Sequence, residues 1–343
     1  MDDDHICEKE VCSWWKSSVF VILLLFCFIF LGIFFSGYSV FGHEGYSPIR
    51  IAMNAWPGYS HHTFLALENG FFEEEGVDVE INMFNEYMDS LNAFRDGKVD
   101  GFFGVYSDAI SLAAEGYPVS VVYVSDFSNG GDVIMASPNV RNVSNLKGRT
   151  VSVAELNSFS HLFVLDLLEK NGLNENDVNI VVVPEPEVLK MLELGYIDAG
   201  HTFEPFQSEA IAKGYNLIAS SADVPGSIVD VLVVRKDVAQ NHPEKVKGVI
   251  EGLFLAERFL VENPEQSRSY ISERTGVTSY DLNEELKGIK ILNREENKDI
   301  FNETKAFSLY ARGEFIVDFF MKKGVISEPV DLDELIDSRF VLD

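Results

Sequence analysis

Two stretches of the sequence, about 100 residues apart, repeat the same order of expected elements. In the first stretch we expect strands at 50–55, 77–81 and 99–103, with helices at 61–68 and 87–96 between them. In the second we expect strands at 149–154, 178–183 and 196–200, with helices at 160–170 and 187–194. Gly97 and Gly195, 98 residues apart, each end a helix before a strand. Short apolar strands that alternate with helices predict two similar α/β lobes, each built on a parallel sheet.

The chain passes between the two predicted lobes twice. The apolar, β-branched run at 231–234 predicts a strand that returns the chain to the first lobe, and amphipathic helices follow at 243–261 and 303–323. Crossings near 131–136 and 228–234 predict a hinge. The predicted domains are therefore lobe 1 at 49–132 and 231–343, and lobe 2 at 133–230, with a ligand cleft between them.

The N-terminal region contains a segment that differs from the rest of the chain in its apolar composition and lack of charge. Residues 17–42 carry no charge, and 19–35 is nearly unbroken Val, Ile, Leu and Phe. A helix over 19–41 reaches about 35 Å, which is enough to cross a bilayer core. We predict a cytoplasmic tail at 1–16, a transmembrane anchor or uncleaved signal at 17–41, and a linker at 42–48. A cleaved signal peptide is the alternative, but this apolar stretch is longer than the usual signal and the tail before it is acidic.

Composition excludes several classes of function. The formal net charge of −28 repels phosphate backbones, so we expect no nucleic-acid partner. The three cysteines, Cys7, Cys12 and Cys27, precede the globular part, which therefore has no disulfide, thiolate metal site or cysteine nucleophile. No Ser-His-Asp order or phosphate-binding glycine loop is present. We expect no metal, no cofactor and no catalysis.

The first lobe offers candidate ligand-binding residues just after its strands, where open parallel sheets bind ligands. Trp56 and Tyr59 follow the first strand and present flat rings for a planar or apolar group, unless Trp56 belongs to the core. Asn85 follows the second strand. Ser107 follows the third, where capping of the next helix is favoured over binding.

Four further candidates border the two crossings. Asp126, Ser128 and Gly131 lie at the first, and Asp230 lies beside the second. Gly131 permits close approach of the backbone, and Asp126 either binds ligand or braces the hinge. For Asp230, bracing of the hinge is favoured.

The second lobe offers two groups of candidates. Ser158, Ser160 and His161 stand where a helix begins, so they suit an acidic ligand group or, alternatively, cap the helix and pack. Glu204 stands beside Phe203 after the equivalent strand end. A carboxylate framed by aromatic rings suits an amine or a ring N–H.

From residue 49 to the end, a set of segments occurs in order and points to one family. They are 55–59 (AWPGY), 66–79, 126–132, 146–151, 160–161, 202–206 and 223–235. Together they resemble the nitrate/taurine/sulfonate/thiamine-precursor family of periplasmic binding proteins. The resemblance implies a type II two-lobe fold and delivery of the ligand to a membrane permease with a cytoplasmic ATPase. Phe203 and Phe206 depart from the tryptophans that relatives often carry.

The sequence thus predicts a monomeric, membrane-tethered solute-binding protein of an ABC importer, with its globular part outside the cytoplasm. It would capture a small nitrogen- or sulfonate-containing molecule by closure of the cleft and deliver it to the permease. A tethered ligand sensor that works through a signalling partner is the first alternative. The second is an enzyme like the pyrimidine synthases of the same superfamily, which rely on a cofactor-bearing lysine, a histidine and a cysteine cluster. Segment 56–67 has no lysine, and the chain from His43 onward has no cysteine.

Overall fold

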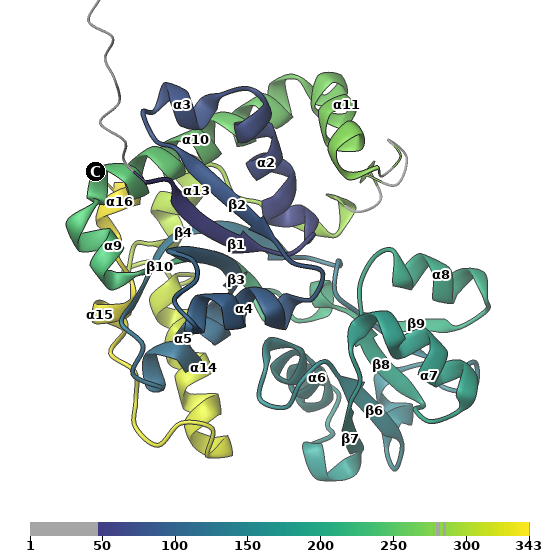
Figure 1. Ribbon diagram of the computed structural model, residues 1–343. Helices are drawn as coiled ribbons and strands as arrows, with labels where there is room; N and C mark the ends of the chain where they lie inside the picture. The colour runs from purple at the N-terminus through teal and green to yellow at the C-terminus, as the bar shows by residue number, and fades with distance from the viewer. Residues whose placement is uncertain (1–46, 277, 279–281, 284–285, 343) are drawn as a thin grey trace, which may run out of the picture. The chain divides into compact units, whose positions relative to one another are not determined.

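The computed structural model describes residues 47–276, 278, 282–283 and 286–342, and residues 48–343 form one compact unit (Figure 1). Within the described part of the chain, no helix has the length and apolar character that a membrane span requires. The predicted anchor at 17–41 lies outside the described residues and stays a prediction.

A six-stranded sheet organises the larger lobe. Its strand order is β11-β4-β10-β3-β1-β2. The strands are β1 (Ile49–Met53), β2 (Val79–Met83), β3 (Gly101–Val105), β4 (Val119–Ser128), β10 (Val229–Arg235) and β11 (Ile289–Ile291). β1 runs parallel to β2 and β3, whereas β10 runs antiparallel to β3 and β4, and β11 antiparallel to β4.

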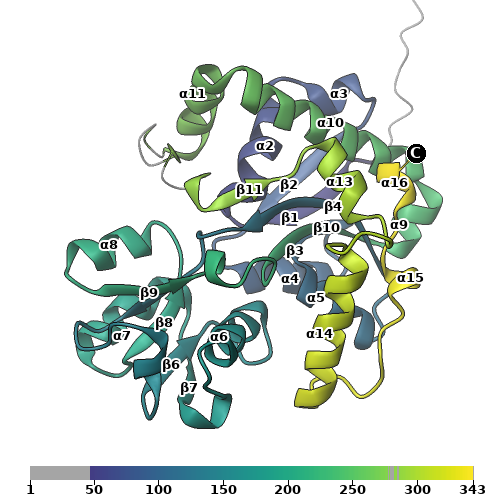
Figure 2. The same ribbon diagram turned by 180° about the vertical axis from the view of Figure 1, so that it is seen from behind.

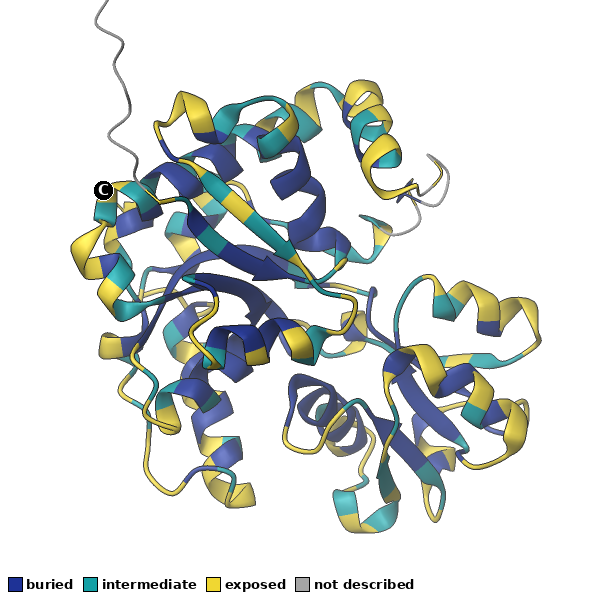
Figure 3. Cartoon of the chain, viewed as in Figure 1, coloured by how far each residue is buried: buried dark blue, intermediate teal, exposed yellow. Residues whose placement is uncertain are grey.

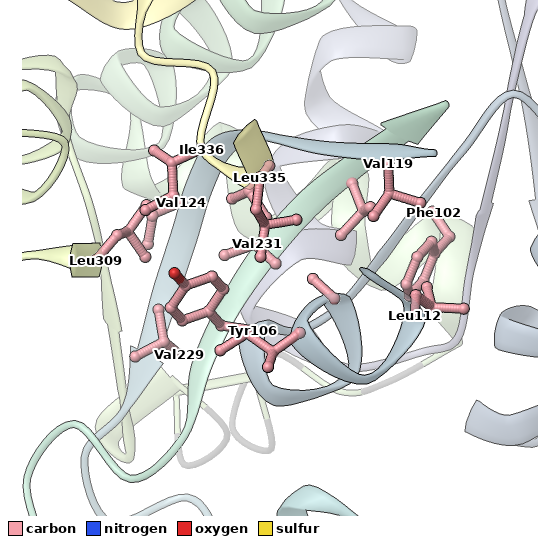
Figure 4. Packing of buried hydrophobic residues seen from close by; sticks show 14 of the residues in the cluster. Phe102, Tyr106, Leu112, Val119, Val124, Val229, Val231, Leu309, Leu335 and Ile336 are labelled. Atoms are coloured by element: carbon pink, nitrogen blue, oxygen red, sulfur yellow. The ribbon is translucent and has the colours of Figure 1, made fainter. Parts of the chain in front are cut away.

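Helices cover both faces of this sheet (Figures 1 and 2). One face carries α2 (Pro57–Glu68), α3 (Phe71–Glu74), α10 (Pro243–Glu262) and α11 (Pro264–Thr275), and the other α4 (Tyr87–Arg95), α5 (Tyr106–Ala114) and α14 (Leu309–Lys323). The shorter helices are α9 (Lys236–Asn241), α13 (Arg294–Ile300), α15 (Leu332–Leu335) and α16 (Arg339–Leu342). Successive residues of β10 enter opposite cores: Val231 packs in one core with Tyr106 and Leu335, as Figure 4 shows, and Leu232 packs under α2 and α10 in the other.

A five-stranded sheet organises the smaller lobe, in the order β7-β6-β8-β5-β9. Its strands are β5 (Val133–Ala136), β6 (Thr150–Val153), β7 (Asn179–Val182), β8 (Ala199–Thr202) and β9 (Asn216–Ser220). α6 (Phe159–Lys170) packs on one face, and α7 (Val188–Leu194) and α8 (Phe206–Ala212) on the other. Four 3₁₀ turns complete it: η1 (Val143–Leu146), η2 (Glu175–Asp177), η3 (Glu185–Glu187) and η4 (Ser221–Asp223). In both sheets the inner strands are buried and the outer faces of the helices are exposed (Figure 3).

The predicted repeat is confirmed, and its two copies also share side-chain contacts. Gly97 and Gly195 both have left-handed backbones, with φ of 70° and 71°. Arg50, at the start of the first copy, pairs with Asp100 at 2.8 Å, and Arg149 of the second copy pairs with Asp198 at 2.8 Å. Each aspartate also accepts a backbone N–H at the start of the first strand of its copy. The two copies therefore fix their first and third strands in the same way.

The expectation of purely parallel sheets is wrong in part. Both sheets are mixed, because the strands next to the crossings, β4 and β10 in one sheet and β5 in the other, run antiparallel to neighbours. The crossings are the segments at 129–132, between β4 and β5, and 221–228, between β9 and β10. β10 joins the six-stranded sheet, as expected, and the predicted boundaries of the lobes stay a prediction.

Two predicted helix boundaries moved. α2 begins at Pro57 rather than at residue 61, because proline suits the first position of a helix. α14 begins at Leu309 rather than at 303, because the Ser308 hydroxyl caps it by accepting the N–H of Ala311 at 3.2 Å.

Candidate functional site

A cleft of about 660 Å³ lies between the two sheets. This volume is in the range of sites for small molecules. From the larger lobe, residues of the β1–α2 loop, the β2–α4 loop, β10 and the end of α11 line it; from the smaller lobe, residues of η3, the start of α6 and the β8–α8 loop. Its lining meets the ends of β1, β2 and β3, as the open-sheet rule predicts.

Trp56 and Phe203 bridge the cleft. Trp56 follows β1 in the larger lobe and Phe203 follows β8 in the smaller. Their ring centroids are 5.8 Å apart at an interplanar angle of 89°, which is an edge-to-face contact. Phe206, whose ring lies 6.0 Å from that of Phe203, extends the aromatic surface. The indole Nε1–H of Trp56 donates to Asp126 Oδ1 at 3.0 Å, so the tryptophan is held in a fixed orientation.

Tyr59 lies at the floor of the cleft and is 1% exposed. Its ring stacks on Phe103 with centroids 5.1 Å apart, and its hydroxyl donates to Asn54 Oδ1. Burial raises the pKa of Tyr59 well above its usual value, so the phenol stays protonated. The early start of α2 causes this placement, since it puts Tyr59 in the first helical turn against the sheet. The alternative in which Trp56 is core and Tyr59 is exposed is therefore wrong: Tyr59 is part of the core, and Trp56 is half-buried against it.

Carboxylates dominate the polar part of the lining. Five of them line the cleft: Glu86, Asp132, Glu185, Glu204 and Asp230. Among the described lining residues, Arg274 is the one arginine or lysine, and its guanidinium stands over the Phe64 ring at 5.5 Å. Glu204 also accepts the N–H and the hydroxyl of Ser208, at 3.1 and 2.9 Å, at the start of α8. In the described residues, no cluster of three or more His, Cys, Asp or Glu side chains is arranged to hold a metal ion.

Three buried aspartates meet where the first crossing joins the cleft. Asp126 on β4 is paired in register with Asp230 on β10, and Asp132 follows β4. Burial raises the pKa of Asp126 to about 6, although hydrogen bonds from Trp56 and Ser125 oppose the shift. Burial, and then the charges of Asp126 and Asp132, raise the pKa of Asp230 well above its usual value. The Asp126–Asp230 pair therefore holds a proton at a pH where exposed aspartates are ionised.

The aspartate pair makes stability depend on pH. An unfolded aspartate has a pKa of about 3.8 and folded Asp126 one of about 6, so between these values the folded protein binds more protons. Its free energy of unfolding therefore falls as the pH rises through this window. Asp126→Asn keeps an acceptor for Trp56 and carries no charge. We expect this variant to be more stable than the parent by about 1–3 kcal/mol at pH 8, and equally stable at pH 4.

Melting temperatures measured from pH 4 to pH 8 test this expectation. The matched control is Asp318→Asn, because Asp318 is exposed on α14, away from the cleft, and its removal should leave the profile unchanged. Parallel profiles for Asp126→Asn and the parent would show that Asp126 does not carry the buried proton.

A buried histidine that the sequence analysis missed supports Asp132. His201 lies inside β8 and is fully buried. Its Nε2 is 2.7 Å from Asp132 Oδ1, and its Nδ1 is 2.8 Å from Ser160 Oγ. In the neutral tautomer with its proton on Nε2, the imidazole donates to the carboxylate and accepts the serine hydroxyl at Nδ1. A histidine within an apolar strand could have indicated this cluster in the sequence, because a buried polar ring needs hydrogen-bond partners on both nitrogens.

The candidates at the start of α6 do not line the cleft. Ser160 binds His201 and accepts the N–H of Ala154 at 2.9 Å. His161 Nδ1 accepts the N–H of Asn157, and its Nε2 lies 3.2 Å from Glu175, away from the cleft. Ser158 occupies the N-cap position, but its hydroxyl donates to the Glu155 carbonyl and makes no cap bond. These three side chains complete the local fold of the loop.

The remaining candidates divide between the cleft and its surroundings. Asn85 is exposed in the lining. Ser107 is fully buried outside the lining, and its predicted capping role is wrong because Val105 holds the N-cap position of α5. Ser128 braces the first crossing, since its hydroxyl lies 2.8 Å from Ser221 Oγ and accepts the N–H of Asp132. Gly131 lies behind Trp56: a Cβ on it would stand 3.1 Å from Trp56 Cη2.

Sequence reasoning missed two parts of the cleft. Glu185 and Pro186 enter it through η3, directly after β7, a position that the strand-end rule indicates. Burial raises the pKa of Glu185. The end of α11, with Arg274 and Gly276, also lines the cleft, although it lies far along the chain from the other lining residues of this lobe. No local sequence pattern predicts that contact.

Comparisons with known proteins agree with this architecture. The model of the NMT1-like family matches residues 42–273. The taurine-binding periplasmic protein of Escherichia coli (strain K12) is 25% identical over 231 residues, which cover 64% of this chain and 71% of the relative. A 4-amino-5-hydroxymethyl-2-methylpyrimidine phosphate synthase of Aspergillus parasiticus is 25% identical over 264 residues, or 74% of each chain. The crystal structure of the periplasmic aliphatic sulphonate binding protein of Escherichia coli superposes with a TM-score of 0.67 at 19% identity, covering 84% of this chain and 96% of that one. The fold is thus that of the periplasmic binding proteins.

Proposed function

The chain belongs to the NMT1-like family, and we propose that it is an extracytoplasmic solute-binding protein of an ABC importer. It captures a small nitrogen- or sulfonate-containing molecule and delivers it to a permease that a cytoplasmic ATPase drives. The observation that carries this proposal is the cleft of about 660 Å³ lined by both sheets and flanked by two chain crossings. A ligand that contacts both lobes stabilises the closed form, in which it makes more contacts than in the open form. The permease then recognises the closed form.

Membrane attachment is part of the same proposal. An uncharged segment at 17–41 would anchor the chain, with the tail 1–16 inside and the globular part outside as a monomer. The name of the taurine-binding relative, which places that protein in the periplasm, supports this orientation.

The relative with pyrimidine-synthase activity makes an enzyme the competing class. The described lining of the cleft contains neither lysine nor cysteine, the side chains on which the synthase resemblance depends. The polar groups that it does contain are the carboxylates, Arg274, His61, and hydroxyl and amide groups such as those of Asn54, Asn85 and Ser60, which suit hydrogen bonding to a ligand. This composition favours capture over chemistry.

Native mass spectrometry of the full chain, after incubation with a small-molecule extract and gentle desalting, tests capture against catalysis. We expect one retained compound per chain, and the compound released by denaturation should have the same mass as the one in the extract. Release of a compound absent from the extract, or conversion of the compound in proportion to time, would establish an enzyme instead. Retention of nothing from extracts of several growth conditions would contradict the proposed function.

A further inference from the structure

Two buried carboxyl oxygens in the cleft accept no hydrogen bond from a nitrogen or hydroxyl donor of the described structure, although Asp230 shares the proton of its pair with Asp126. They are Asp132 Oδ2 and Asp230 Oδ2. The two residues are 2% and 3% exposed, and both line the cleft. His201 satisfies the other oxygen of Asp132 and leaves Oδ2 without a donor. Buried oxygens without donors cost free energy, so this end of the cleft is prepared to receive hydrogen-bond donors.

Three helix starts near the cleft, those of α2, α5 and α8, are already occupied by carboxylates of the chain itself, although helix starts are the usual places for anionic ligand groups. A Cβ on Gly58, in the first turn of α2, would lie 2.2 Å from Asp126 Oδ1, so that carboxylate fills the space against the turn. Asp108, in the first turn of α5, accepts the Tyr87 hydroxyl, and Glu204 accepts the Ser208 N–H at the start of α8. An anionic ligand would meet negative charge at all three.

The cleft lining also has an aromatic part. Trp56, Phe203 and Phe206 form a continuous aromatic surface within the same lining as the carboxylates. Aromatic faces attract cations and cover apolar groups, and both effects strengthen where water is excluded.

We propose that the ligand is a nitrogen cation, an organic amine or a protonated heterocycle with an apolar or aromatic body. Its charged N–H groups donate to Asp132 and Asp230, and its body lies against Trp56, Phe203 and Phe206. This inference rests on the proposed function and narrows it: of the nitrogen- and sulfonate-containing molecules considered above, the cleft selects the cationic ones.

Proton exchange on binding follows from the charges that surround Asp230. Asp126 and Asp132 near β4, Asp108 on α5 and the Tyr59 hydroxyl on α2 all act on it. A cation placed among these groups offsets their mutual repulsion and favours ionised carboxylates, so its binding releases protons. An anion has the opposite effect, and its binding takes protons up.

Isothermal titration calorimetry of the full chain tests the inference with three probes that share one body. They are 2-phenylethylamine, 2-phenylethanol and 2-phenylethanesulfonate, each titrated in two buffers of different ionisation enthalpy at pH 7. We expect the amine to bind at least about tenfold tighter than the alcohol, with proton release, because a charge-assisted hydrogen bond to a buried carboxylate contributes 1.4 kcal/mol or more. The sulfonate should bind more weakly than the alcohol.

Variants of the cleft carboxylates, each compared with a matched control, test whether these groups cause the preference for the amine over the alcohol. Asp132→Asn should lower the affinity for the amine at least tenfold and leave that for the alcohol nearly unchanged, whereas Asp318→Asn removes a remote charge and should change neither. Because Asp132 is buried, Glu86→Gln, at an exposed lining residue, serves as a second variant that keeps the core intact and should weaken the amine alone.

The outcomes separate the two proposals. Tighter binding of the sulfonate, proton uptake, or equal affinity for amine and alcohol overturns the cationic ligand and leaves the solute-binding function standing. If none of the three probes binds, the compound retained in native mass spectrometry decides: an anion overturns the inference, and a cation supports it. The absence of both probe binding and a retained compound contradicts the solute-binding function itself.

Discussion

Replacing Gly58 with alanine should lower the free energy of unfolding by about 2–4 kcal/mol, a large effect for a single methyl group. The new Cβ would stand 2.2–2.3 Å from the carboxyl group of Asp126. That carboxyl group cannot move aside cheaply, because it is fully buried and holds hydrogen bonds from Trp56 and Ser125. Displacing it would break these bonds and disturb the aspartate pair.

A double-mutant cycle makes the test specific. In the Asp126→Ala background the space is open, and Gly58→Ala should then be neutral or stabilising by up to about 1 kcal/mol, since alanine is the better helix former. Urea unfolding of the four proteins measures the coupling. Equal cost of Gly58→Ala in both backgrounds would show that the Asp126 carboxyl group does not lie against the first turn of α2.

Local pattern was sufficient to predict most of the fold. The two Gly-ended helices before β3 and β8 marked the repeat, and helical and strand periods placed the elements to within a few residues. What the repeat did not reveal is strand direction. β4, β5 and β10 run against neighbours because the chain changes sheets at those points, and that choice depends on the packing of the whole chain rather than on any single segment.

The site was predictable where it follows strand ends and unpredictable where it depends on side-chain direction. Trp56, Phe203 and Glu204 were found because they follow β1 and β8. His161 was misplaced because adjacent helical residues point about 100° apart, and its neighbour Ser160 took the inward direction toward His201. The end of α11 reaches the cleft from more than 200 residues beyond Trp56, so no local rule placed Arg274 there.

Ligand binding should draw the two lobes together, and we expect this motion to be the largest structural change that the protein undergoes. The crossings at 129–132 and 221–228 are short segments between strands, so rotation about them moves each lobe as a body. The edge contact between Trp56 and Phe203 already joins the lobes, and a ligand beside it adds contacts from both sides. Such contacts favour the closed form in proportion to the difference in affinity between the two forms.

Spin labels on opposite sides of the cleft measure this motion directly. Glu209 on α8 and Glu273 on α11 are exposed, lie outside the cleft lining, and flank its two walls. With Cys7, Cys12 and Cys27 replaced by serine, cysteines at these two positions carry the labels. The distance between the labels, measured by double electron–electron resonance without ligand and with a saturating binder from the amine, alcohol and sulfonate series, should become shorter and more narrowly distributed. Identical distance distributions with and without a ligand that calorimetry shows to be bound would mean that the lobes do not close, and the solute-capture account would fail.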